Sequence, residues 1–215
     1  MSLGIVEEND NYIVIHKPAG VPTQTSQPGQ KDLVSEVNNY LFSKGNKCPR
    51  ISVINRLDQP VEGLVLFAKN SKAAAVLTGC LNDNGIEKYY EAVVFGHLSE
   101  KSGRLENMLI KDSKTNMSRI AGSVEKQAKR AILEYEVIES DDLTDKVRIH
   151  LLTGRHHQIR VQFSHIGHPL LGDLKYGNDE SIGLSKERNV KNVSLLAYKL
   201  SFFDTFKGKE VSFTL

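Results

Sequence analysis

The chain has 215 residues, of which 25% are charged and 40% hydrophobic. These values are ordinary for a folded protein and exclude a mainly disordered chain. No apolar run is long enough for a transmembrane helix, and the first residues lack the basic and apolar blocks of a signal peptide. Cys48 and Cys80 lie too far apart for a zinc ribbon. They fit a reducing compartment better than a disulfide scaffold, so we expect a cytoplasmic protein.

Short apolar runs rich in β-branched residues predict strands along the chain. The expected strands cover residues 12–16, 51–54, 63–68, 90–94, 131–138, 147–152 and 195–203. Helical periodicity predicts helices at 32–44, 71–84 and 155–166, whereas the polar stretch 177–192 is interpreted as a loop or insertion. Strands outnumber helices and do not alternate with them. We therefore expect an α+β fold with a mixed, largely antiparallel central sheet and a few flanking helices, in one domain over residues 1–215.

The charge is distributed unevenly. The 28 Lys and Arg residues and the 26 Asp and Glu residues leave a formal net charge of +2. Between Lys146 and Lys175, however, five cations accompany a single acid, Asp173, and five of the seven histidines lie in the same stretch. This pattern predicts a localised anion site, although a solvated charged face would have the same composition.

The third expected helix has cations at its unfavourable end. Arg155, His156, His157 and Arg160 fall in its first two turns, where the helix dipole disfavours positive charge. Such a cost indicates a nearby anion, either a buried carboxylate or a phosphate. A structural salt bridge is the simpler interpretation.

Residues 55–63 join two of the expected strands and contain the candidate carboxylate. Pro60 and Gly63 predict a turn that presents Asp58 at the end of the sheet, a usual place for catalytic groups. A lone Asp in a turn is more often only a turn residue, so its position alone leaves both interpretations open.

Motifs for several common sites are missing from the sequence. It has no P-loop, no G-x-G-x-x-G, no G-x-S-x-G and no H-E-x-x-H. His165 and His168 have a spacing that metal ligands can have, but Pro169 follows at once and no further ligand completes a shell. We therefore expect no metal site.

Five blocks, in order, resemble the RluA family of pseudouridine synthases. Residues 56–69, RLDQPVEGLVLFAK, are similar to the segment around that family's catalytic aspartate. Residues 13–22 resemble its K-P-A-G turn, Lys88 and Tyr90 match K-x-Y, and residues 128–137 resemble the long strand that follows. Residues 152–177 are similar to T-G-R-x-H-Q-I-R-V-H…G-x-P-I-x-G-D-x-x-Y-G, the most specific block. The resemblance covers about residues 4–178 and, more weakly, the C-terminal strands.

This resemblance implies an enzyme that isomerises uridine in ribosomal or transfer RNA to pseudouridine without a cofactor. By the resemblance, Asp58 is the essential carboxylate, acting either as nucleophile at the ribose C1′ or through a glycal-like intermediate. Arg160 would pair with Asp58 and keep it ionised, since a neighbouring cation lowers a carboxyl pKa. Tyr90 would stack on the extruded uracil and assist the final proton removal.

RNA is the expected partner, and no membrane association is expected. A monomer is the simplest expectation. The candidate RNA-binding side chains lie around the K-x-Y and T-G-R blocks, in the Asp58 segment and in an expected hairpin arm; they are Arg56, Lys88, Arg155, His157, Gln158, Lys111 and Arg119. Each of the charged ones could equally be a solvated surface charge.

Two positions depart from the family pattern. Asn55 stands where the family usually has His, and Val61 and Glu62 replace a Thr-Ser pair. Glu62 brings an extra carboxylate close to Asp58 unless it faces solvent. Two other functions therefore stay open: an RNA-binding relative that has lost turnover, and a hydrolase that uses Asp58 with Glu62 on a glycosidic bond.

Overall fold

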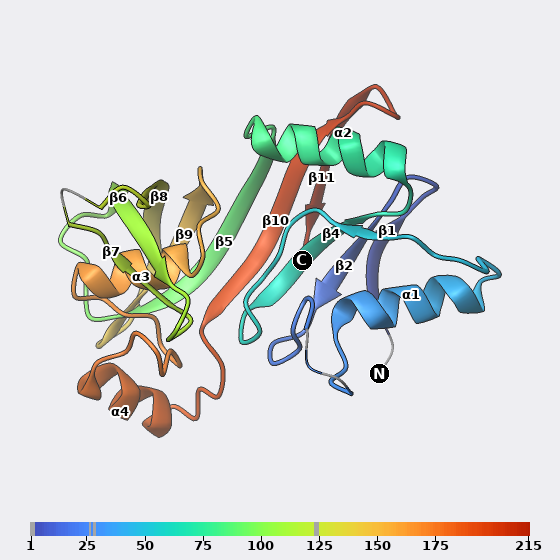
Figure 1. Cartoon of the computed structure of the whole chain (residues 1–215). Helices are drawn as coiled ribbons and strands as arrows, with labels where there is room; N and C mark the ends of the chain where they lie inside the picture. Colours follow the sequence, from blue (N-terminus) through green and yellow to red (C-terminus); the bar gives the residue numbers. More distant parts are fainter. Residues whose placement is uncertain (1–2, 26, 28, 123–124) are drawn as a thin grey trace. The chain divides into compact units, whose positions relative to one another are not determined.

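The structure is a computed structural model that describes residues 3–25, 27, 29–122 and 125–215 (Figure 1). The residues group into two compact units, Met1–Glu87 with Ala197–Leu215 and Lys88–Leu196, called here the first and second unit. The expectation of a single domain stays a prediction. In the described part of the chain, no helix combines the length and the apolar character that crossing a membrane requires.

The first unit is built on largely antiparallel strands. Its strand order is β1 (Gly4–Glu8), β2 (Tyr12–Lys17), β4 (Glu62–Ala68) and β10 (Leu195–Asp204), with β3 (Ser52–Val53) paired to β4 and β11 (Lys209–Thr214) paired to β10. Two helices complete the unit, α1 (Leu33–Ser43) and α2 (Ser71–Asn82). Both begin at a side-chain cap, because Asp32 accepts from the Ser35 amide and Asn70 accepts from the Ala73 amide.

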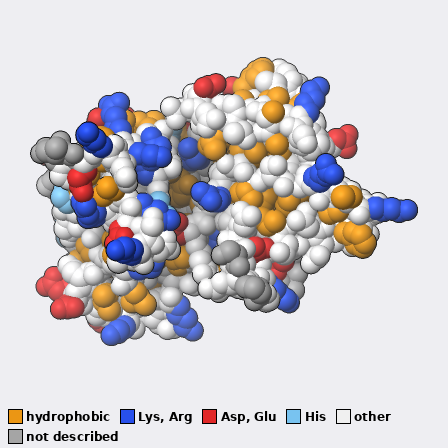
Figure 2. Space-filling model, viewed as in Figure 1, with side chains coloured by type: hydrophobic (Ala, Val, Ile, Leu, Met, Phe, Trp, Pro, Cys, Tyr) orange, Lys and Arg blue, Asp and Glu red, His pale blue; other side chains and the backbone are white. Residues whose placement is uncertain are grey.

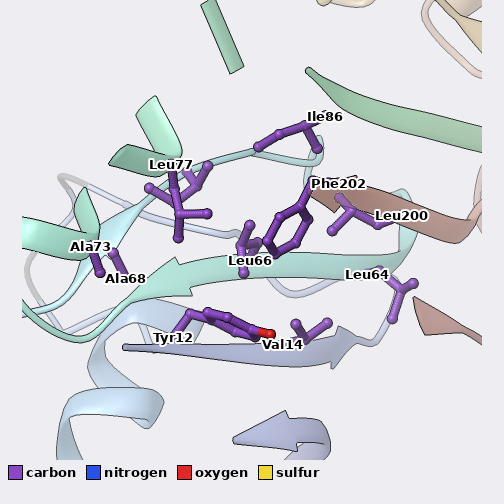
Figure 3. Packing of buried hydrophobic residues seen from close by; sticks show 11 residues of the cluster. Tyr12, Val14, Leu64, Leu66, Ala68, Ala73, Leu77, Ile86, Leu200 and Phe202 are labelled. Atoms are coloured by element: carbon purple, nitrogen blue, oxygen red, sulfur yellow. The ribbon is translucent and has the colours of Figure 1, made fainter. Parts of the chain in front are cut away.

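The core of the first unit forms where one face of the sheet meets α2. Leu66 of β4, Phe202 of β10 and Leu77 of α2 are almost fully buried, and Tyr12 of β2 packs edge-on against Phe202 (Figure 3). The Tyr12 hydroxyl donates to Asp204 at 2.8 Å, so the one polar atom of this ring is satisfied. This packing holds β2 and β4, the two strands that lead into and out of the candidate site.

The second unit contains a run of antiparallel strands and two helices in the described part of the chain. Its strand order is β5 (Ile86–Phe95), β9 (Thr144–Leu151), β8 (Lys129–Ser140), β6 (Ser102–Asp112) and β7 (Met117–Ile120). The helices are α3 (Gln158–His165) and α4 (Asp179–Glu187). Leu109 of β6, Ala131 of β8 and Val161 of α3 form a small apolar cluster under α3. The helix is thereby fixed to the sheet through β6 and β8.

The structure confirms the α+β class, the largely antiparallel sheet and every strand and helix that the sequence predicted. It adds β1, β6, β7, β11 and α4, which the periodicity did not predict. The interpretation of residues 177–192 as a loop was wrong, because α4 occupies most of that stretch. Asn178 and Ser181 form a reciprocal capping box that starts this helix.

The third helix begins later than predicted. His157 is its N-cap residue and has a left-handed backbone, with φ of 54°. Arg155 and His156 therefore precede α3, and of the predicted first-turn cations only Arg160 lies in the helix. Ile159 and Phe163 are buried, whereas Ile166 is 37% exposed.

Gly63 occupies a position that no other residue can take without strain. Its φ is +133°, and a Cβ built on it would lie 2.4 Å from the Ala197 carbonyl oxygen. We expect Gly63→Ala to lower the free energy of unfolding by about 3 kcal/mol or more, from overpacking and a forced φ. Urea denaturation followed by circular dichroism measures it.

The matched control for this substitution is Gly79→Ala. Gly79 lies within α2 with nothing within 4 Å of a built Cβ, so alanine there should stabilise the protein by about 0.5–1 kcal/mol. Equal effects of the two substitutions would contradict the close approach of β4 to Ala197.

Candidate active site

Asp58 lies half-buried in the loop between β3 and β4. Its carbonyl accepts the amide of Val61 at 3.0 Å, which closes a tight turn through Gln59 and Pro60. The turn that the sequence predicted for this segment is therefore present, and β4 follows it directly.

The residues on either side of Asp58 are held by the K-P-A-G segment. The Thr23 hydroxyl donates to the Leu57 carbonyl at 2.9 Å and accepts the Leu57 amide at 3.2 Å. Gln59 exchanges two hydrogen bonds with Gly20, from the Gly20 amide to the Gln59 carbonyl at 2.8 Å and from the Gln59 side chain to the Gly20 carbonyl at 3.0 Å. The backbone of Asp58 is thus fixed from both sides.

Lys17 connects the K-P-A-G turn to the Asp58 loop. Its side chain is fully buried, and Nζ donates to the carbonyls of Pro18, Val21 and Gln59 at 3.0, 2.7 and 3.2 Å. Burial lowers the pKa of Lys17 to about 8, opposed by the carboxylates of Asp58 and Glu62. The K-P-A-G block contributes to the family resemblance, but the sequence alone predicts no role for its lysine.

The two departures from the family pattern are accommodated by hydrogen bonds. The buried Asn55 side chain donates to the Leu64 carbonyl at 3.1 Å and accepts the Leu66 amide at 2.8 Å, so it attaches the loop to β4. Glu62 contacts His16 Nε2 at 2.8 Å on the neighbouring strand, and both side chains are partly exposed. Glu62 therefore has a partner of its own beside Asp58.

Arg160 in α3 makes a buried, two-pronged ion pair with Asp173. Its Nε donates to one carboxylate oxygen at 2.7 Å and its Nη2 to the other at 2.8 Å. The side chains are only 4% and 0% exposed. Asp173 is therefore one buried carboxylate beside this helix, whereas the predicted pairing of Arg160 with Asp58 stays a prediction. Such a fork fixes the plane of the guanidinium.

Asp173 and Tyr176 order the loop that follows α3. The Asp173 carboxylate also accepts the amides of Lys175 and Tyr176 at 3.0 and 3.2 Å. The Arg160 guanidinium lies over the Tyr176 ring, 5.1 Å from its centre. Asp173 and Tyr176 belong to the G-D-x-x-Y-G part of the family block. That motif is the signal in the sequence from which a role for these two residues could have been predicted.

The Tyr176 hydroxyl joins the start of α3 to strand β7. It contacts His157 Nδ1 at 2.7 Å and accepts the Ser118 amide at 2.7 Å, while the Ser118 hydroxyl contacts His156 Nδ1 at 2.9 Å. The two histidine rings stack at 3.7 Å. His157 thus has a positioning role inside the second unit, and its contact with RNA stays a prediction.

Gln158 is another predicted RNA-binding residue with internal partners. It is 3% exposed, accepts from the Thr153 hydroxyl and the Arg155 amide at 2.8 and 3.0 Å, and donates to the Ile132 carbonyl. These contacts fix the T-G-R turn before α3. A direct contact between Gln158 and RNA likewise stays a prediction.

Tyr90 and Lys88 lie on the same buried face of β5, two residues apart, and are 6% and 8% exposed. Desolvation lowers the pKa of Lys88, and the nearby guanidinium of Arg155 lowers it further. Arg155 donates from Nε to the Arg130 carbonyl at 2.9 Å, which holds this exposed side chain against β8. Two cations are therefore placed close together beside Tyr90.

The remaining predicted RNA contacts are exposed. Arg56 lies beside Asp58 in the same loop, and Lys111 lies near the turn of the β6–β7 hairpin, which confirms the expected arm. Arg119 on β7 is already paired, because both of its Nη atoms donate to Glu125. In the described residues no group of three or more His, Cys, Asp and Glu side chains could hold a metal ion.

Comparison with known proteins gives the family. A family model described as RNA pseudouridylate synthase matches residues 11–165. A ribosomal large subunit pseudouridine synthase D from Haemophilus ducreyi is 34% identical over 81% of this chain and 53% of its own length. The synthase D of Vibrio cholerae is 32% identical over 99% of this chain and 67% of its own length. The chain thus spans about half to two thirds of the length of these relatives.

Solved structures show the same fold. The human RNA pseudouridylate synthase domain containing 1 superposes with a TM-score of 0.79 at 26% identity, over 98% of this chain and 82% of that one. The human RNA pseudouridylate synthase domain containing 4 superposes with a TM-score of 0.80 at 21% identity, over 99% of this chain and 87% of that one.

The buried ion pair gives a stability prediction. Asp173→Asn removes the charge of the carboxylate that forks the buried Arg160 guanidinium, and we expect it to lower the free energy of unfolding by about 3 kcal/mol or more. Glu106→Gln removes the same charge from an exposed pair with Arg130 and should cost much less. Urea unfolding of both variants decides, and equal losses would contradict a special role for the buried pair.

Lys17 gives a prediction of pH dependence. Its folded pKa of about 8 lies below its ordinary value of 10.5, so between these values the unfolded chain binds a proton that the folded chain does not. The free energy of unfolding therefore rises with pH. Between pH 7.5 and 9.5 we expect the wild type to gain about 2 kcal/mol relative to Lys17→Met. Urea midpoints at both pH values measure this, and a constant difference between the two proteins would contradict it.

Proposed function

The chain belongs to the RluA-type RNA pseudouridylate synthase family, and from that premise we propose that it isomerises uridine in RNA to pseudouridine. The N1–C1′ bond of uridine breaks, the uracil turns, and C5 bonds to C1′ in its place. The C5 proton then leaves and N1 is protonated, so the product has the composition of the substrate. Neither an oxidant nor a second substrate is needed.

The observation that carries this proposal is the clamped Asp58. A carboxylate that acts at C1′ must be held within a narrow range of positions, because small displacements of a reacting group cost large factors in rate. Leu57 and Gln59 are hydrogen-bonded to Thr23 and Gly20, and the buried ammonium of Lys17 attracts the carboxylate between them. Both routes, direct attack and a glycal-like intermediate, use Asp58 in this role.

We assign Arg160 and Tyr90 to the same reaction. Arg160 is proposed to pair with Asp58 and keep it ionised, and the Asp173 fork supports this by holding the guanidinium in one plane. Tyr90 is proposed to stack on the extruded uracil and to assist removal of the C5 proton. Tyr90 lies on a regular strand, β5, which suits a stacking surface.

The proposed substrate is ribosomal or transfer RNA, with a target uridine in a loop or single-stranded region. The names of the bacterial relatives favour RNA of the large ribosomal subunit. Lys88 and Arg155 support a phosphate contact, because an anion between them would relieve the mutual repulsion that lowers the pKa of Lys88. Arg56, Lys111, Arg119, His157 and Gln158 complete the proposed RNA-binding set.

The setting of the protein is also a proposal. We propose that it works as a monomer in the cytoplasm, without a metal or a cofactor. Its cysteines, Cys48 and Cys80, are free thiols, which suits a reducing compartment.

The experiment that tests the function is tritium release from RNA labelled at uracil C5, comparing the wild type with Asp58→Asn. The substitution keeps the size of the side chain and removes its charge. We expect the rate to fall about 1000-fold or more, while the affinity for the same RNA stays within about threefold. Full activity of Asp58→Asn would contradict the assignment. A wild type that binds RNA but releases no tritium from unmodified RNA would show a binding protein instead.

A further inference from the structure

Residues 37–57 carry four cations, Lys44, Lys47, Arg50 and Arg56, and no Asp or Glu. The segment begins in α1, leaves the end of that helix and runs through β3 into the loop of Asp58. All of it lies in the first unit. The chain that approaches the proposed catalytic carboxylate is therefore uniformly positive.

Lys47 and Arg50 are exposed, and neither has a carboxylate partner in the described part of the chain. Lys44 differs from them. It lies 3.7 Å from Glu8, and its ammonium is 5.0 Å from the centre of the Tyr40 ring. It also caps the negative end of α1, where a cation is favourable by itself. Lys44 is thus accounted for inside the protein, whereas Lys47 and Arg50 are not.

An exposed aromatic ring accompanies these cations. Phe42, in the last turn of α1, is 62% exposed. A single exposed ring is common on protein surfaces and proves nothing alone. Figure 2 shows, however, hydrophobic and basic side chains together over the end of α1 and the segment after it, at the right of the view. Phe42, Lys47 and Arg50 are called here the α1 tip.

An exposed aromatic ring followed in the chain by cations without a carboxylate partner has the chemistry of a surface for single-stranded nucleic acid. The cations attract phosphates and release counterions, and the ring stacks on a base of any sequence. A protein partner for such a surface would need matching acidic groups around an apolar pocket. RNA supplies both the negative charge and the stacking face without further requirement.

We propose that the α1 tip binds the single-stranded flank of the substrate RNA, outside the target uridine. The inference rests on the proposed function, because it takes RNA as the substrate. Lys47 and Arg50 contact phosphates and Phe42 stacks on a base. The segment then continues through Arg56 to Asp58, so the RNA follows a single basic segment of the first unit toward the reacting uridine.

The test is the affinity of the full chain for a fluorescent oligouridine of about 30 nucleotides, measured by fluorescence anisotropy. The salt concentration is varied from about 50 to about 300 mM, a range in which counterion release changes the affinity measurably. Lys47→Gln with Arg50→Gln should reduce the slope of log K against log salt by about 1.4, since each lost contact with a single strand is worth roughly 0.7. Phe42→Ala should weaken binding about fivefold or more and leave the slope unchanged.

The matched control is Lys186→Gln with Lys191→Gln, which changes the net charge equally at two exposed positions of the second unit. The control should keep the wild-type slope. An unchanged slope in the tip variant, or an equal loss in the control, would overturn the proposal. So would loss of self-association in sedimentation of the tip variants, because the tip would then join two copies of the chain.

Pseudouridine formation by the same wild-type preparation separates this inference from the proposed function. A reduced slope without any pseudouridine supports the RNA surface and contradicts the activity. Pseudouridine formation with an unchanged slope supports the activity and contradicts the surface.

Discussion

The buried pair of Arg160 and Asp173 is the interaction on which the order of the second unit depends. A guanidinium without a counter-charge cannot stay buried, so α3 and the loop at Asp173 must be in place together. The same carboxylate accepts two amides of that loop, and the Tyr176 hydroxyl links the loop to His157 and to β7. One ion pair thereby connects a helix, a loop and the hairpin arm.

The first unit uses a buried cation in a comparable way. The ammonium of Lys17 donates to three backbone carbonyls. Those carbonyls belong to the K-P-A-G turn and to the Asp58 loop, so the two segments share one donor. The cost of burying the ammonium appears in its lowered pKa. In the first unit, therefore, a buried charge fixes the loop of Asp58, and in the second unit a buried ion pair fixes the Asp173 loop to α3, the helix of Arg160.

Glu62 bears on the choice between an isomerase and a hydrolase. A hydrolase that works with two carboxylates needs the second one available to a water molecule. Glu62 is instead bonded to His16 on the adjacent strand. Asn55, the other departure, uses its amide to attach the loop to β4. Both departures have partners on β2 or β4, and the isomerase is the function that this arrangement favours.

Sequence patterns predicted the elements that bury an apolar face. Strands such as β2 and β4 are apolar on both sides, and α1 has a clear buried stripe at Leu33, Val37 and Leu41. The missed strands β1 and β11 are largely exposed and carry little apolar signal, and α4 depends on a capping box more than on periodicity.

For the site, too, sequence motifs predicted some residues and could not predict others. Motifs identified Asp58, Tyr90 and Arg160 as candidates, but Asp173 could not be chosen as the partner of Arg160 from spacing alone. That pairing depends on a loop conformation thirteen residues away along the chain. The three carbonyl acceptors of Lys17 could not be predicted either, because every residue has a backbone carbonyl and the sequence does not show which ones lie near the ammonium.

The most direct test of the central claim is a nucleoside balance. Unmodified RNA is incubated with the protein, digested completely and measured by mass spectrometry for uridine, pseudouridine and free uracil. Isomerisation by this chain predicts that every uridine lost reappears as pseudouridine, with no uracil released. Free uracil would show a hydrolase, and unchanged uridine in RNA that the protein binds would show that the chain does not catalyse the reaction.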